Sequence, residues 1–156
     1  MRRACSFFAF AALAVTLLAA CGGGSEEDFQ TDVVAARNRT DAALEQIVRA
    51  KSIDDLLERM RIAATEIRGT ATDVRDADAP DGMADDADAL EQALRALSDE
   101  IVGTVTTFEQ NPEAVAMASG FDFASWNQVN ARLAALRRQG IDVPPLERQK
   151  PPEPAP

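Results

Sequence analysis

The chain contains no histidine and no tyrosine, and its 156 residues include one tryptophan and two cysteines. The absence of histidine argues against Ser-His-Asp triads, the Glu-x-x-His di-iron sites of helical bundles, and imidazole-ligated haem or zinc. Gly22, Gly23 and Gly24 are not followed by Lys-Ser or Lys-Thr, so no phosphate-binding loop is present. The formal net charge of −10 argues against nucleic acid as a partner. We therefore expect a protein that is not an enzyme.

Aromatic residues are also scarce, at 5% of the chain, although hydrophobic residues reach 46% and alanine is abundant. Strands favour aromatic and β-branched residues, whereas alanine and straight-chain residues favour helices. The length allows one ordinary domain with its own core. The composition therefore predicts an all-α protein.

The first 21 residues have the pattern of an exported protein. Arg2 and Arg3 precede an apolar run of 17 residues, which is short for a membrane-spanning helix and typical of a secretion signal. The run ends in Leu18-Ala19-Ala20-Cys21 and continues into a glycine, serine and acidic stretch. These residues resemble the lipobox of bacterial lipoproteins.

In that family the cysteine thiol receives a diacylglycerol, the signal is cleaved immediately before the cysteine, and the new amine is often acylated. The resemblance implies that residues 1–20 are a lipoprotein signal peptide and that Cys21 carries the lipid. It also implies an anchor in the cell membrane or the outer membrane, facing outside the cytoplasm. From the composition we expect no cofactor besides this lipid. An uncleaved signal anchor and an ordinary signal peptide are the alternatives. Residues 21–28 are then expected to be the lipidated cysteine and a flexible spacer.

Three stretches with apolar residues at alternating spacings of four and three follow, as expected for helices with one apolar face. They run from Phe29 to Ala50, from Ile53 to Val74, and from Met83 to Phe108. Ser52 with Asp55 forms a variant capping box, which favours a helix-helix corner over one long irregular helix.

A fourth, less regular stretch begins after Asn111-Pro112 and is interrupted at Ser119-Gly120. Asp122 is the predicted N-cap of its second part, and Gly140 is the predicted C-terminal glycine, with Ile141 packing back on the last turn. The sequence thus predicts an antiparallel, up-down four-helix bundle with a broken last helix over residues 29–142. Residues 143–156 are rich in proline and are predicted to be a disordered tail.

The stretch from residue 73 to residue 100 contains ten acidic residues and only two arginines. The EF-hand spacing fails there, which leaves Asp76, Asp78 and Asp81 as weak candidate ligands for a divalent cation or as a solvated loop. No acidic residue lies within an apolar stripe, so we expect no carboxylate with a pKa raised by burial and no glycosidase-like pair.

The aromatic cluster Phe121, Phe123 and Trp126 is either a partner surface or one end of the core. Beyond the lipobox, the pattern resembles small, uncharacterised helical lipoproteins of high-GC bacteria. We expect a membrane-tethered, structural or partner-binding module of the cell envelope, with an envelope protein as its partner. The alternatives are a carrier of a small apolar ligand, with a cavity among Met60, Leu94 and Trp126, and a weak divalent-cation binder.

Overall fold

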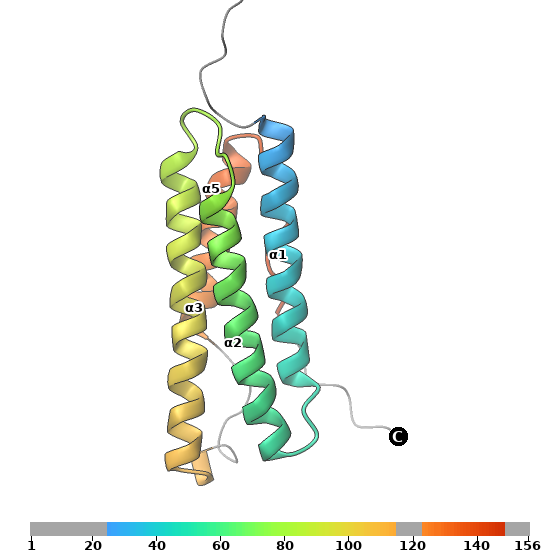
Figure 1. The fold of residues 1–156 in the computed structure, drawn as a ribbon, viewed down its shortest axis with the longest axis vertical. Helices are drawn as coiled ribbons and strands as arrows, with labels where there is room; N and C mark the ends of the chain where they lie inside the picture. Colours follow the sequence, from blue (N-terminus) through green and yellow to red (C-terminus); the bar gives the residue numbers. More distant parts are fainter. Residues whose placement is uncertain (1–24, 115–122, 149–156) are drawn as a thin grey trace, which may run out of the picture.

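The computed structural model describes residues 25–114 and 123–148, and these contain four α-helices and no β-strand (Figure 1). The all-α prediction is therefore confirmed. The signal peptide, Cys21 and the Ser119-Gly120 interruption lie outside the described residues. Among the described helices, none combines the length and the apolar character that crossing a membrane requires. The helices are α1 (Glu26–Val48), α2 (Ile53–Asp76), α3 (Ala84–Gln110) and α5 (Ala124–Arg138).

The helices pack side by side along their lengths (Figure 1). α1 packs on α2, α2 on α3, and α3 on α5. The turn from α1 to α2 and the loop from α2 to α3 lie at opposite ends of α2. Gly82 has a φ of 87° in that second loop, a conformation that a glycine adopts without the penalty of a Cβ atom.

Serine side chains fix the first two helix starts. The Ser25 hydroxyl accepts a hydrogen bond from the Asp28 N–H at 3.0 Å, and α1 consequently begins at Glu26 rather than Phe29. The predicted spacer is therefore too long, because Glu26–Asp28 form the first helical turn. The Ser52 hydroxyl accepts from the Asp55 N–H at 3.1 Å, and Asp55 accepts from the Lys51 N–H at 2.8 Å. This reciprocal cap confirms the corner at Ser52.

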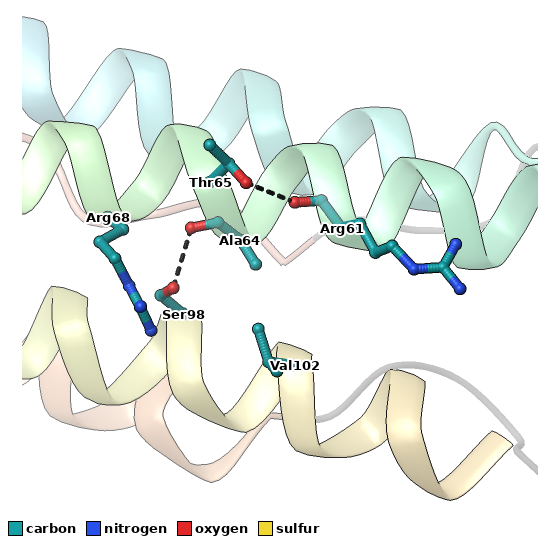
Figure 2. Close-up of a pocket in the computed structure, with 6 residues that line it drawn as sticks. All are labelled: Arg61, Ala64, Thr65, Arg68, Ser98 and Val102. Atoms are coloured by element: carbon teal, nitrogen blue, oxygen red, sulfur yellow. Dashed lines mark hydrogen bonds between the residues drawn. The ribbon is translucent and has the colours of Figure 1, made fainter. Parts of the chain in front are cut away.

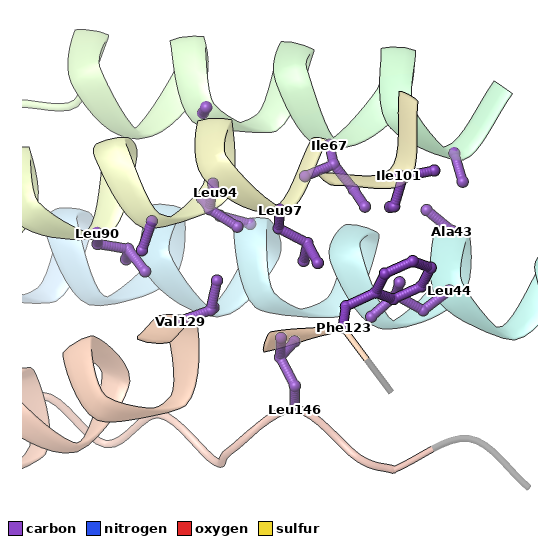
Figure 3. Packing of buried hydrophobic residues seen from close by; sticks show 14 of the residues in the cluster. Ala43, Leu44, Ile67, Leu90, Leu94, Leu97, Ile101, Phe123, Val129 and Leu146 are labelled. Carbon is purple, nitrogen blue, oxygen red and sulfur yellow. The ribbon is translucent and has the colours of Figure 1, made fainter. Parts of the chain in front are cut away.

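One continuous hydrophobic core runs between the helices (Figure 3). The apolar stripe predicted from Phe29 to Ala50 is buried as far as Ile47, with Ala50 partly buried, and most positions of the other stripes are buried too. The second stripe begins later than predicted. Ile53 is 47% exposed and Leu57 is half-buried, whereas Leu56 enters the core. The most deeply buried large side chains include Met60, Ile67, Leu97, Ile101 and Leu136.

Candidate functional site

The main departure from the predicted fold is an extended segment that follows α5, residues 141–148, which we call the strap. Gly140, with a φ of 108°, ends the helix, and the Ile141 N–H donates to the Leu136 carbonyl at 3.2 Å. This confirms the predicted glycine ending, with Ile141 buried over the last turn. A Cβ atom on Gly140 would lie 3.3 Å from the Glu26 Oε1, so α5 ends close to the start of α1.

The strap is anchored by apolar side chains at three positions. Ile141, Val143 and Leu146 are buried, and Leu146 points from the strap into the core cluster (Figure 3). The prediction of a disordered tail from residue 143 is therefore wrong for residues 143–148. Proline fixes the backbone in an extended form, and here that form is compatible with packing because the residues on both sides of Pro144-Pro145 are apolar. Residues 149–156 lie outside the described residues.

Polar side chains of α1 and α5 hold the backbone of the strap. On α1, the Gln30 amide oxygen accepts from the Asp142 N–H at 2.8 Å, and the Arg37 guanidinium donates to the Pro145 carbonyl at 2.6 and 3.0 Å. Two more hydrogen bonds run from strap N–H groups to these helices: Glu147 to Asp41 at 3.0 Å and Leu146 to Asn130 at 2.7 Å.

The spacing of these contacts shows that the strap follows α1. The α1 contacts run from residue 30 to residue 41, about 16 Å along a helix. The matching strap atoms run from residue 142 to residue 147, about 16 Å in an extended chain. The two segments therefore stay in register over three successive contacts.

Arg37 and Asp41 form a partly buried ion pair under the strap. Their closest N···O distance is 2.6 Å, and their side chains are only 11% and 13% exposed. Burial raises the pKa of Asp41, although the Glu147 N–H and Arg37 act in the opposite direction. The expectation that no carboxylate has a pKa raised by burial is therefore wrong. Asp41 is engaged by two partners, the Arg37 guanidinium and the Glu147 N–H, and so links α1 to the strap.

The aromatic residues lie beside the strap. Phe123 is buried in the core, so its ring is not part of an exposed partner surface. Trp126 is half-buried against the core, and the Arg148 guanidinium carbon lies 5.4 Å from its ring centroid. Phe121 lies outside the described residues.

The start of α5 is capped by another helix. Phe123, the N-cap residue, provides no side-chain hydrogen bond. Instead, the two carboxylate oxygens of Glu100 in α3 accept from the Ala124 and Ser125 N–H groups, each at 2.8 Å. Burial acts to raise the pKa of Glu100, but these hydrogen bonds outweigh it and the pKa is lowered. Asp122, the predicted cap, lies outside the described residues.

Glu100→Gln is expected to reduce the free energy of unfolding at pH 7 by about 1–2 kcal/mol, the usual value of a helix cap. Because the folded pKa is below the unfolded one, the carboxylate stabilises the fold above the unfolded pKa of about 4.3 and loses this effect as the pH falls through the folded pKa. Urea unfolding of both proteins at pH 7 and pH 3 measures the difference. Asp99→Asn is the matched control, since Asp99 is exposed and pairs with Arg68 of α2. A difference unaffected by pH would contradict the capping role.

The acidic loop shows no arrangement for a metal. Asp76, Asp78 and Asp81 are exposed, and the Asp76 carboxylate lies 2.9 Å from the Arg75 Nη2 atom. Among residues 25–114 and 123–148, no group of three or more acidic, cysteine or histidine side chains is placed to hold a metal ion.

A shallow groove of ≈ 420 Å³ lies between α2 and α3 (Figure 2). Its lining includes Arg61 and Arg68, which pair with Glu109 and Asp99. The Ser98 hydroxyl donates to the Ala64 carbonyl at 2.8 Å across the groove floor. No carboxylate is among the groove's lining residues, so it offers no acid–base pair. Two further open grooves lie along α1 and α2. Neither of them is lined by Met60 or Leu94, two residues of the predicted ligand cavity, and both side chains are buried in the core.

Comparisons of the chain with protein-family models, with curated protein sequences and with solved structures give no match. The residues that hold the strap were not predicted from the sequence. A signal was available, because Arg37 and Asp41 are an i,i+4 pair that directly flanks the apolar stripe of α1.

Proposed function

We propose that this chain is a lipid-anchored, non-catalytic, helical partner-binding module of the bacterial cell envelope. The observation that carries the proposal is the lipobox ending at Cys21, only four residues before Ser25, the N-cap of α1. Four residues span at most about 14 Å, so a lipid on Cys21 would hold the start of α1 close to the membrane surface.

The packing supports one orientation on the membrane. α5 ends beside the start of α1, because Gly140 approaches Glu26, and the Gln139 side chain donates to Asp86 at the start of α3. The loop between α2 and α3 lies at the same end (Figure 1). This end carries eight acids, Glu26, Glu27, Asp28, Asp76, Asp78, Asp81, Asp85 and Asp86, and three arginines, Arg75, Arg137 and Arg138, so it is net acidic.

Anionic lipids repel such a surface within about one Debye length, about 8 Å at physiological salt. We infer that the helices stand away from the lipid surface, with the sides and the opposite end of the domain accessible to a partner. We also infer that the helices form an up-down-up-down bundle. The packing of consecutive helices and the position of the connections at opposite ends of α2 support this topology.

Metabolic labelling with an alkyne fatty acid tests the anchor. The wild-type chain is expected to take up label, and Cys21→Ala is expected to take up none. Cys5→Ala is the matched control, because it removes the other cysteine of the leader and leaves the lipobox intact. Label on the Cys21→Ala chain would contradict the proposal.

A further inference from the structure

The strap occupies a groove between α1 and α5, and we propose that this groove is a binding site for an extended peptide. In this molecule residues 141–148 are its intramolecular occupant. A partner protein would enter it with an extended, proline-containing segment of the same apolar spacing. The inference deepens the proposed partner-binding function and rests on it for the existence of such a partner.

The groove exists because the helices do not close it themselves. The extensive helix–helix contacts among the described residues join α1 to α2, α2 to α3, and α3 to α5. α1 and α5 are instead bridged by the strap, which bonds to Gln30, Arg37 and Asp41 on one side and to Asn130 on the other. Without an occupant, the apolar surfaces under Val143 and Leu146 would face water.

The polar groups of the groove recognise a backbone rather than particular side chains. All the hydrogen bonds just described end on a strap N–H or carbonyl group. Every peptide presents the same groups at the same spacing when extended, and main-chain bonds combined with apolar pockets are the usual means of binding extended segments. The Arg37 to Glu147 contact is long, at 3.9 Å, and Glu147 is 79% exposed. It therefore adds little sequence preference.

The buried strap positions define the segment that would fit. Ile141, Val143 and Leu146 are buried at the first, third and sixth positions, whereas Pro144 and Pro145 are exposed between them. The two prolines pre-form the extended backbone and so reduce the entropy lost on binding. Pro145 also leaves its carbonyl to Arg37 while requiring no partner for an N–H.

An intramolecular occupant competes at an effective concentration in the millimolar range. A partner segment must therefore displace the strap, and displacement is observable. Trp126 is the single tryptophan of the chain, and Arg148 of the strap lies over its ring. Its fluorescence should report whether the strap is in place.

The test uses the mature chain with Val143→Asp and Leu146→Asp, which is expected to release the strap without shortening the protein. Binding of a fluorescent peptide with the sequence of residues 141–148 is followed by anisotropy. We expect the released variant to bind this peptide at least tenfold more tightly than the wild type does, because the wild-type groove is filled. Asp142→Asn, which changes a charge at an exposed strap side chain and keeps the Asp142 N–H that bonds Gln30, is the matched control and should behave as the wild type.

A second pair of substitutions in the released variant locates the site. Arg37→Ala should weaken peptide binding at least tenfold, since it removes both bonds to the Pro145 carbonyl. Arg39→Ala, two residues away on α1 and paired with Asp73, should leave binding unchanged. Equal binding by these two variants, or equal binding by the wild type and the released variant, would overturn the proposal.

Val143→Ala combined with Leu146→Ala takes the place of the aspartate double variant if circular dichroism shows that the latter is unfolded. If the folded variant with a released strap, whichever of the two it is, does not bind the peptide, the proposal is also overturned. The peptide assay needs no lipid, so its outcome is separate from that of the labelling experiment. If Cys21 is labelled but the peptide does not bind, only the groove proposal is contradicted. If the peptide binds but Cys21 is not labelled, only the lipid anchor is contradicted.

Discussion

Leu146→Ala is expected to lower the free energy of unfolding by about 2–4 kcal/mol, as for other fully buried leucines. Leu146 is 2% exposed although it lies in the proline-containing segment that follows the last described helix. The truncation would remove apolar contact area and leave a cavity beside α5, where Asn130 holds the Leu146 N–H. Chemical denaturation at several protein concentrations, followed by circular dichroism, measures the change.

The matched control is Ile53→Ala, which truncates a large aliphatic side chain that is 47% exposed. Its expected cost is below about 1 kcal/mol, since little apolar area is lost from the folded state. Equal effects of the two substitutions would mean that Leu146 is not docked in solution. A disordered tail predicts no effect of Leu146→Ala, so this experiment separates the two descriptions of the strap most directly.

The features that were predicted correctly depend on local chemistry. The α1 stripe follows from a spacing of three and four residues, the corner follows from Ser52 and Asp55, and the end of α5 follows from Gly140. In each case the interacting residues lie within about one helical turn of one another. Such interactions form in almost any tertiary context, which is why the sequence alone identifies them.

The features that were missed depend on contacts between distant parts of the chain. Arg37 and the Pro145 carbonyl are 108 positions apart, and Glu100 caps a helix that begins 24 positions later. Neither contact is implied by composition, because prolines and charged residues occur equally in solvated tails. Besides the Arg37–Asp41 pair, the apolar residues on either side of Pro144-Pro145 were an available indication, and their burial requires the groove between α1 and α5.

Phe123 and Trp126 show how one motif can be divided by packing. Both rings were assigned to one cluster with two possible roles, a core or a surface. The structure buries Phe123 in the core and places Trp126 at its edge, beside Arg148. The amphipathic indole accounts for the intermediate position, because its ring packs on apolar residues while its outer face meets a cation.

Cys21→Ala is expected to change the location of the protein almost completely, from the membrane fraction to the soluble fraction. Two or three acyl chains anchor a protein stably, at about 0.8 kcal/mol for each buried CH₂ group. Arg137 and Arg138 also lie at this end, but the acids around Glu26 and Asp86 outnumber them, so electrostatic attraction to anionic lipid does not replace the acyl chains.

The substitution is best combined with an ordinary cleavable secretion signal in place of residues 1–20, because a lipobox without its cysteine leaves the apolar run uncleaved. Cys5→Ala with the native leader should stay in the membrane fraction. Mass spectrometry of the native protein adds an independent reading: the lipoprotein has lost residues 1–20 and gained the mass of its lipid. An intact leader would instead identify an uncleaved signal anchor, and a soluble wild-type chain would show that Cys21 carries no lipid. Only the lipid accounts for both the mass and the change of location on substitution of this one sulfur.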